Sequence, residues 1–79
     1  MARVINHVEN NIVGDRIRKI RADRRMSQQE LSLYLEAYAI YICRGSISRI
    51  ENHERTVTDF ELRAMAEVLD VSIYELFDK

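Results

Sequence analysis

The stretch Met26–Asn52, MSQQELSLYLEAYAIYICRGSISRIEN, decides how the rest of the chain is arranged. Ser27 followed three residues later by Glu30 has the form of a capping box. In that motif the two side chains satisfy the first free amides of a helix. A helix is therefore predicted to begin at Gln28, with leucines at positions 31 and 35 on its buried side.

A second short helix is predicted over residues 44–52, RGSISRIEN. Ile47 and Ile50 lie three residues apart, which puts both on one side of that helix. The opposite side holds small, polar and donor-rich residues: Arg44, Gly45, Ser48, Arg49 and Asn52. A helix anchored in a core on one side and carrying arginines on the other suits entry into the major groove of DNA. An ordinary solvated helix face is the alternative interpretation.

Three segments follow one another in an order typical of a known family: VGDRIRKIRADRRMSQQEL at 13–31, SISRIEN at 46–52 and VTDFELRAMAEVLDVSIYELF at 57–77. The pattern resembles the Cro/C1-type, or XRE, helix-turn-helix family of bacterial and phage DNA-binding regulators. The resemblance implies an all-α, compact five-helix, lambda-repressor-like fold. It also implies a sequence-specific transcriptional regulator, repressor or activator, whose third helix enters the major groove of a two-fold symmetric operator.

The same resemblance implies which residues touch DNA. Base contacts are expected from Arg44, Gly45, Ser48 and Arg49. Phosphate contacts are expected from Ser27, Gln28, Gln29, Arg24, Asn52 and Arg55. Arginine reads guanine O6 and N7, and each good bidentate pair contributes about 1–3 kcal/mol of discrimination. Gly45 has no side chain that reads a base, so we expect it to allow close approach of the backbone to DNA.

One segment departs from the family pattern. The interval from Leu35 to Ile47 is twelve residues, about five more than in typical members of the family. Either the helix that begins at Gln28 continues by more than a turn, or a longer loop follows it. We expect the helix to reach about Ala39 and an extended link to follow, because IYI is β-branched and alternating. The insertion could form a partner surface or an effector-sensing element, but buried packing is favoured for such apolar clusters.

Residues 1–10 show no clear periodicity and are expected to form an N-terminal arm, which leaves 11–79 as the helix-turn-helix domain. A first helix is predicted from about Asn11, as its N-cap, to Arg24. Its inner stripe consists of apolar residues at positions 13, 17 and 20. Gly14 weakens this helix, so we expect a neighbouring helix to pack closely there.

Two more capping boxes, Thr58 with Glu61 and Ser72 with Glu75, predict two further helices and favour an all-helical fold. Because the end of the third helix lacks the glycine common in the family, Asn52 or His53 is expected to adopt the left-handed conformation there. The resemblance also places the last helix at a homodimer contact. Its candidate residues are Ile73, Tyr74 and Phe77. The alternative is that all of them except Tyr74 close the core.

Composition agrees with a soluble chain, since 47% of its 79 residues are hydrophobic, 32% are charged, and no apolar run approaches a membrane span. The N-terminus lacks a secretory signal and the single Cys43 cannot form an internal disulfide, so a cytoplasmic location is expected. The formal net charge is −1, but residues 1–55 carry ten Lys or Arg against seven Asp or Glu, whereas residues 56–79 carry two against six. The local charge around the predicted site therefore matters more than the total.

The expected partners are double-stranded DNA and a second copy of the chain, with RNA polymerase or another regulator as further candidates. In the family, an activator touches polymerase through a few side chains, often acidic, and the candidates are Glu36, Glu51 and Glu54. As an alternative function, the same fold could bind protein, as the antitoxin of a toxin pair or as an adaptor for another regulator.

The sequence carries no pattern typical of catalysis, a metal site or a cofactor site. His7 and His53 are isolated, and there is no glycine-rich phosphate loop. We therefore expect no enzymatic activity, no metal and no cofactor. Cys43 falls where the family often has the N-cap of the third helix, a position that can lower a thiol pKa and permit a redox switch. A packed, inert cysteine is the favoured interpretation.

Overall fold

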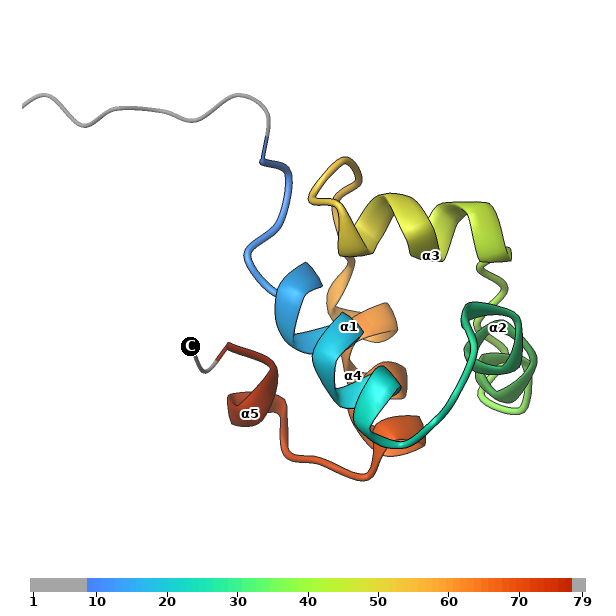
Figure 1. The fold of residues 1–79 in the computed structure, drawn as a ribbon. Coiled ribbons are helices and arrows are strands. Elements are labelled where there is room, and N and C mark those ends of the chain that lie inside the picture. The colour runs from blue at the N-terminus through green and yellow to red at the C-terminus, as the bar shows by residue number, and fades with distance from the viewer. Residues whose placement is uncertain (1–8, 78–79) are drawn as a thin grey trace, which may run out of the picture.

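The computed structural model describes residues 9–77, and this range contains five α-helices and no strand. They are α1 (Gly14–Asp23), α2 (Gln28–Glu36), α3 (Arg44–Glu51), α4 (Asp59–Leu69) and α5 (Ile73–Phe77). In Figure 1, α3 lies across the top of the helical part, with α1 and α4 beneath one end of it, α2 beneath the other end and α5 at the lower left. The predicted all-α, five-helix architecture is confirmed, whereas most of the predicted arm lies outside the described residues.

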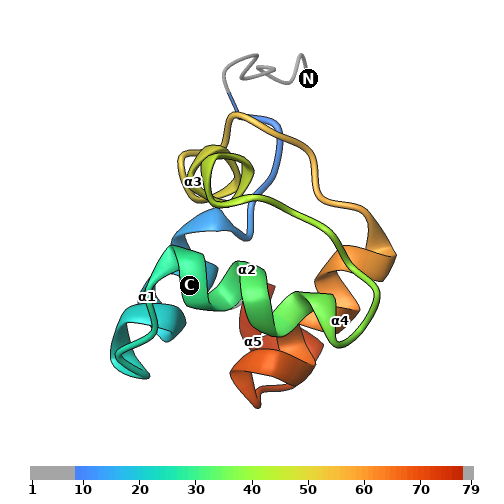
Figure 2. The ribbon, with the colours of Figure 1, turned by 90° about the vertical axis from the view of Figure 1, so that its right-hand side faces the viewer.

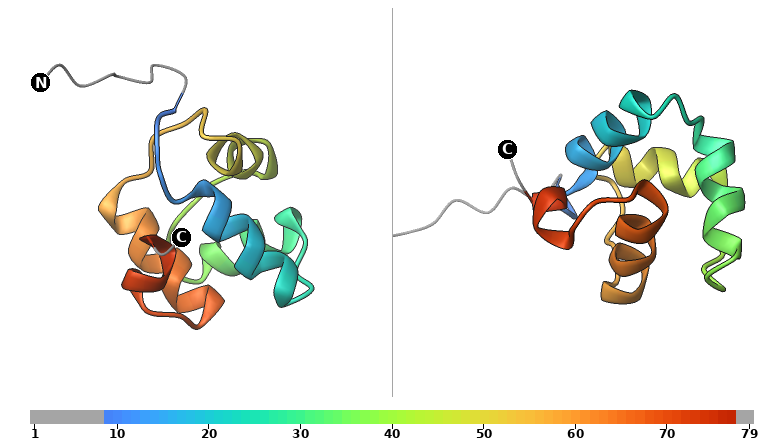
Figure 3. Two further views of the ribbon diagram at one scale, coloured as in Figure 1. Left: turned by 60° about the vertical axis from the view of Figure 1, so that its left-hand side comes forward. Right: turned by 90° about the horizontal axis from the view of Figure 1, so that it is seen from below.

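All five helices contribute to one core. The largest fully buried side chains are Ile17, Leu31, Leu35, Ile47, Ile50, Met65, Leu69 and Leu76. Fully burying such a side chain contributes about 1.5–3 kcal/mol, so this set provides most of the driving force for folding. The short α5 packs against α1 and α4, as the two views in Figure 3 show. None of the helices in residues 9–77 is long and apolar enough to span a membrane.

Helix α1 begins at Gly14 and not at the predicted Asn11. The Asn11 side chain nevertheless completes the start of this helix, because its Oδ1 accepts a hydrogen bond from the Gly14 amide at 2.8 Å. Its Nδ2 donates to the carbonyl oxygens of Ile50 and Arg55, at 3.0 and 2.8 Å. A Cβ at Gly14 would clash with the Ile50 carbonyl oxygen, which confirms the close packing expected there.

Helix α2 begins at Gln28 with the predicted capping box, but it ends at Glu36, so the prediction of a helix to Ala39 is wrong. Ala39 has a φ of 61°. The amides of Ala39 and Ile40 donate back to the carbonyl oxygens of Glu36 and Leu35, at 2.9 and 3.1 Å. These two bonds form a Schellman motif that closes the helix. Of the two arrangements that the sequence allowed, the longer loop is the one observed.

Helix α2 ends early because the chain must turn back to reach the start of α3. Figure 2 shows the link leaving the far end of α2 and running back along it to the start of α3. Each further helical residue would carry the chain about 1.5 Å farther from that point. Reversal at Ala39 instead lets Ile42 enter the core, where its carbonyl oxygen accepts a 2.6 Å hydrogen bond from the Ser32 hydroxyl.

Buried packing was the favoured expectation for the inserted segment, and it holds for the isoleucines only. Ile42 is buried and Ile40 packs against the core, whereas Tyr34, Tyr38 and Tyr41 are exposed. Successive side chains of an extended strand point to opposite sides. In this link Ile40 and Ile42 point towards the core, so the side chain of Tyr41 between them points towards solvent.

Each of the first four helices is closed by a left-handed residue that is not glycine. These residues are Arg25, Ala39, His53 and Asp70, with φ values of 56°, 61°, 64° and 58°. After each of them, the next amide donates to the carbonyl five residues earlier. His53 thus confirms the left-handed cap predicted after α3. A non-glycine residue in this conformation costs roughly 1 kcal/mol.

We expect the substitution Ala39→Gly to raise the free energy of unfolding by about 0.5–1 kcal/mol, because glycine adopts the left-handed conformation without steric strain. The matched control is Ala37→Gly, at an exposed alanine of the same turn with a φ of −63°. That change should lower stability by about 0.5–1 kcal/mol. Denaturant titration of both variants is the measurement, and equal destabilisation by the two would contradict the strain assigned to Ala39.

Candidate nucleic-acid interface

Helix α3 is held by one side and presents the other to solvent. Ile47 and Ile50 are fully buried, as predicted. Arg44, Gly45 and Arg49 are exposed, whereas Ser48 is half-buried. Within residues 9–77, neither Arg44 nor Arg49 takes part in an ion pair, so both guanidinium groups remain available to an external acceptor. The structure thus brings the four predicted base-contacting residues together on one accessible helix.

Gly45 faces open space, because a Cβ added there would meet no atom within 4 Å. Packing inside the protein therefore does not require glycine at this position. A glycine near the start of a helix weakens it by about 1 kcal/mol relative to alanine. The absence of a side chain is consistent with close approach of another molecule to this part of α3.

The carboxylate of Glu51, at the end of α3, is only 2% exposed and is held by two other helices. Arg21 of α1 donates to it twice, from Nε at 2.7 Å and from Nη2 at 3.0 Å. Gln28 of α2 adds a third hydrogen bond, from Nε2 at 2.9 Å. Arg21 also donates from Nη1 to the carbonyl oxygen of Met26, just before α2, at 2.7 Å. These bonds fix α2 and α3 relative to α1.

This network was not foreseen from the sequence, and it corrects one expectation. Glu51 is buried in an ion pair, so it is not the exposed acidic contact for polymerase that was considered. Glu36 and Glu54 are exposed. A glutamate near the end of a polar helix face gave no local sign of burial, since its partners lie 23 and 30 residues away.

The three predicted phosphate-contacting residues at the start of α2 differ in how they are engaged. The Ser27 hydroxyl accepts from the Glu30 amide at 2.9 Å, and the Gln28 side chain is bound to Glu51. Gln29 is exposed. The backbone amides at this end of α2 carry the positive end of the helix dipole, which favours an anion there.

The other predicted phosphate contacts lie in three different places. Arg24 lies beside the end of α4, where its Nη2 is 3.4 Å from the Asp70 carbonyl oxygen. The structure therefore places the Arg24 side chain at the end of α4 and not on the exposed face of α3. Asn52 is exposed at the C-terminal cap of α3.

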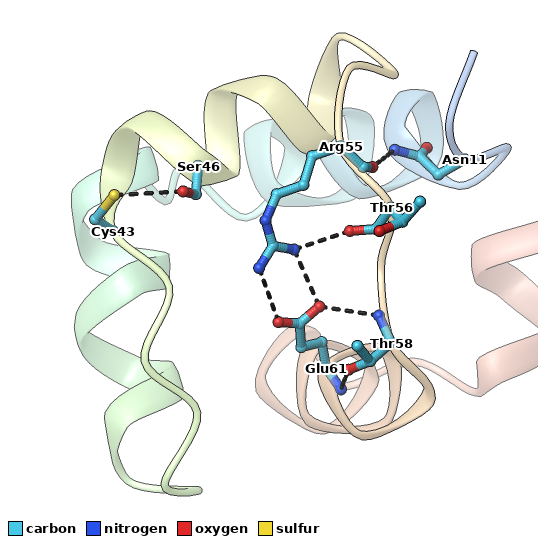
Figure 4. A network of polar contacts seen from close by, with 7 residues as sticks. All are labelled: Asn11, Cys43, Ser46, Arg55, Thr56, Thr58 and Glu61. Atoms are coloured by element: carbon cyan, nitrogen blue, oxygen red, sulfur yellow. Dashed lines mark hydrogen bonds and ion pairs between the residues drawn. The ribbon is translucent and has the colours of Figure 1, made fainter. Parts of the chain in front are cut away.

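Arg55 is the third of these, and it is engaged within the protein. Figure 4 shows its guanidinium facing the Glu61 carboxylate, with both bonds at 3.0 Å. The guanidinium group holds the pKa of Glu61 below its ordinary value. Glu61 also completes the capping box of Thr58, so this pair orders the start of α4.

Cys43 is exposed, so the favoured expectation of a packed cysteine is wrong. It occupies the N-cap of α3, where the family pattern placed it. Its Sγ lies 3.5 Å from the Ser46 hydroxyl oxygen (Figure 4). Hydrogen bonds from the Ser46 hydroxyl and amide lower the pKa of the thiol. A lowered thiol pKa, which is expected at a helix N-cap, is therefore present.

His53 joins the end of α3 to the start of the chain. Its Nδ1 lies 2.9 Å from the Asn11 carbonyl oxygen, and its Nε2 lies 2.9 Å from a carboxylate oxygen of Asp15. The amide of Asn10 in turn donates to the His53 carbonyl at 2.8 Å. Both ring nitrogens face hydrogen-bond acceptors, which favour the protonated ring. The carbonyl of Asn11 and, to a smaller extent, the carboxylate of Asp15 therefore raise the pKa of His53. Isolated in the sequence, His53 had no predicted role beyond its backbone conformation.

The three candidate dimer residues lie on α5. Ile73, Tyr74 and Phe77 are exposed, while Leu76 on the same helix is fully buried. The helix thus uses one leucine to join the core and leaves an apolar surface open.

Within residues 9–77, no group of three or more His, Cys, Asp or Glu residues is arranged to hold a metal ion.

Removing one partner of the buried ion pair should be strongly destabilising. We expect Arg21→Met to lower the free energy of unfolding by about 3 kcal/mol, because the Glu51 carboxylate would stay buried with too few donors. The double variant Arg21→Met with Glu51→Leu should recover most of that loss. Urea unfolding of the single and double variants measures the coupling. Simple additivity of the two losses would contradict the role given to this pair.

The stability of the protein should depend on the protonation of His53. Its folded-state pKa is raised above an unfolded value of about 6.5. The stabilisation is therefore fully present below about pH 6.5 and is lost as the pH rises through the folded-state pKa. We expect the stability advantage of the wild type over His53→Asn to shrink over that range. Asparagine keeps the left-handed cap, and a difference that does not change with pH in urea titrations would contradict this assignment.

Comparison with known proteins was made at the level of family, sequence and structure. A family model described as helix-turn-helix matches residues 17–76, which include α2, α3 and the link between them. A comparison with curated protein sequences found no match. Among solved structures, the chain is similar to the restriction-modification controller protein C.AhdI from Aeromonas hydrophila, with a TM-score of 0.73 and 26% sequence identity. That similarity covers 82% of this chain and 91% of the other.

The family match spans most of the chain and includes the exposed helix α3. The solved relative has the same arrangement of helices. The family consists of regulators and not of enzymes. The protein therefore belongs to the Cro/C1-type helix-turn-helix family and is a DNA-binding transcriptional regulator.

Proposed function

We propose that the protein acts as a homodimer on a two-fold symmetric operator, with α3 of each copy in the major groove of one half-site. The observation that supports this most directly is the division of α3 into a buried isoleucine side and an accessible side, whose two arginines form no ion pair within residues 9–77. A helix in the major groove must present its base-contacting side chains to the DNA while the protein core holds the helix in a fixed position. The Glu51 network gives α3 that rigidity.

In this proposal each residue on the exposed side of α3 has a separate task. Arg44 and Arg49 donate bidentate hydrogen bonds to guanine O6 and N7. Ser48 lies between them on the same face and accepts or donates to a base edge. Gly45 allows the backbone of α3 to approach the groove closely, which agrees with the open space around it.

Phosphate contacts on either side of the groove would set the register of the protein on the duplex. Gln29 and the amide of Gln28 supply the contact at the start of α2, because the amide of Ser27 is held by Glu30 in the capping box. Asn52 supplies another after α3. Arg55 has no direct phosphate contact in this proposal, because its guanidinium is paired with Glu61.

The dimer contact that we propose uses the open apolar surface of α5, formed by Ile73, Tyr74 and Phe77. A two-fold axis there makes the same patch meet itself. It would place the two α3 helices on successive turns of one face of the duplex, with half-site centres about 34–36 Å apart. A chain of this size also gains stability from such an interface. We also propose a cytoplasmic location, because the protein acts on DNA.

The likeness to C.AhdI suggests a first target. That protein is a restriction-modification controller, and the similarity extends over most of both chains. We propose that the operator lies in the control region of a restriction-modification gene set. Protein binding is the second candidate function, because the exposed Tyr34, Tyr38 and Phe60 leave aromatic surface open on α2, on the turn after it and on α4.

Sequence-specific binding can be tested by selecting bound sequences from random DNA with the purified protein. We expect an enriched inverted repeat, and we expect Arg49→Ala to lose about 1–3 kcal/mol of discrimination at one position of each half-site. The control is Arg63→Ala, since Arg63 is an equally charged and exposed residue on α4. It should leave the selected motif unchanged. Salt-sensitive binding with no enriched sequence, unaffected by Arg49→Ala, would contradict the proposal and favour a protein partner.

A further inference from the structure

We propose that Tyr41, in the inserted link, is an additional DNA-contacting residue whose hydroxyl donates a hydrogen bond to a backbone phosphate beside the half-site. This inference rests on the proposed function, because it takes α3 to lie in the major groove. It extends that function to a segment that typical members of the family lack. The insertion would thereby add a contact that the common helix-turn-helix plan does not provide.

Tyr41 shares a groove with two residues already placed at the interface. The groove lies between the exposed flank of α2, the link and the start of α3, and is lined by Gln29, Ser32, Glu36, Tyr41, Ile42, Cys43 and Arg44. Gln29 belongs to the phosphate-facing start of α2, and Arg44 is the first residue of α3. Tyr41 is therefore adjacent to both DNA-facing ends of the motif, although it comes from neither helix.

The link presents Tyr41 rigidly. The residue before it, Ile40, packs against the core, and the residue after it, Ile42, is buried. The carbonyl of Ile42 is fixed by the 2.6 Å bond from the Ser32 hydroxyl. Tyr41 itself is 77% exposed, so its ring contributes little to the core. A tyrosine on a fixed backbone has few rotatable bonds to order, so it provides contact area at a low entropy cost.

The chemistry of the groove suits a phosphate at its α3 end. The Tyr41 hydroxyl and the Gln29 side-chain amide both donate hydrogen bonds that a phosphate oxygen can accept. The guanidinium of Arg44, which also lines the groove, adds positive charge beside them. Glu36 is the only carboxylate among the lining residues. Its charge opposes a phosphate, so we expect Glu36→Gln to increase affinity for DNA. The groove is thus a weak phosphate site. In it the uncharged Tyr41 hydroxyl stabilises the bound phosphate through a hydrogen bond and not through charge.

The decisive variant is Tyr41→Phe, which removes only the hydroxyl. We expect the affinity for the selected operator to fall about tenfold per half-site, because a hydrogen bond to a charged acceptor is lost. The slope of log affinity against log salt should not change, since no cation is removed. Ethylation of one operator phosphate per half-site should weaken the wild type and have no further effect on Tyr41→Phe.

The matched control is Tyr34→Phe. Tyr34 is a half-exposed tyrosine of α2 that lines a different groove, with Met26 and Ala37. It should bind the operator as the wild type does. Unchanged affinity and an unchanged ethylation pattern for Tyr41→Phe, with binding lost in Arg49→Ala, would overturn the Tyr41 contact and leave the proposed function intact.

Two other outcomes separate this inference from its alternatives. If Arg49→Ala also binds like the wild type, the proposed use of α3 fails and the Tyr41 contact fails with it. If Tyr41→Phe binds DNA normally but loses activation in transcription with purified RNA polymerase, the groove contacts polymerase. That result would overturn the DNA contact.

Discussion

The ion pair between Glu51 and Arg21 is the interaction on which the binding geometry depends. A carboxylate that is only 2% exposed would cost several kcal/mol if it lacked partners. Three hydrogen bonds, from Arg21 and Gln28, compensate that cost. Because these donors belong to α1 and α2 and the carboxylate to α3, the bonds form only when the three helices meet at one set of angles. The exposed face of α3 is therefore presented in a fixed orientation.

The first four helices end without glycine, the residue that most often adopts the left-handed conformation at a helix C-terminus. The chain has two glycines and no proline, and left-handed caps fall on Arg25, Ala39, His53 and Asp70. Strain of this kind persists only where surrounding packing determines the backbone. At His53 the strained residue has a second task, because its ring and backbone hold residues 10, 11 and 15 against the end of α3. The same residue thus closes one helix and fastens the start of another.

The inserted segment changes the surface next to α3 without moving α3 away from α2. Ile42 is buried in the core and its carbonyl oxygen is bonded to Ser32, so the additional residues form a turn and a non-helical segment that returns alongside α2. The link contributes Ile42 to the core, and the groove lined by Tyr41 lies beside Arg44 on the surface. A sequence can therefore lengthen this connection and acquire a new exposed residue, Tyr41, at little cost to the fold.

The sequence by itself determined the features that depend on near neighbours along the chain. Capping boxes predicted where α2, α4 and α5 begin, and apolar spacing predicted the buried sides of α1 and α3, since both signals arise within a few residues. Only the tertiary structure decided where α2 ends, that Cys43 and Tyr41 face solvent, and that Glu51 and Arg55 are held by other side chains. The Glu51 network joins residues 23 and 30 positions apart, and the link folds back on a helix that precedes it. Local periodicity carries no information about such partners, because the free energy of those contacts exists only after the helices have packed.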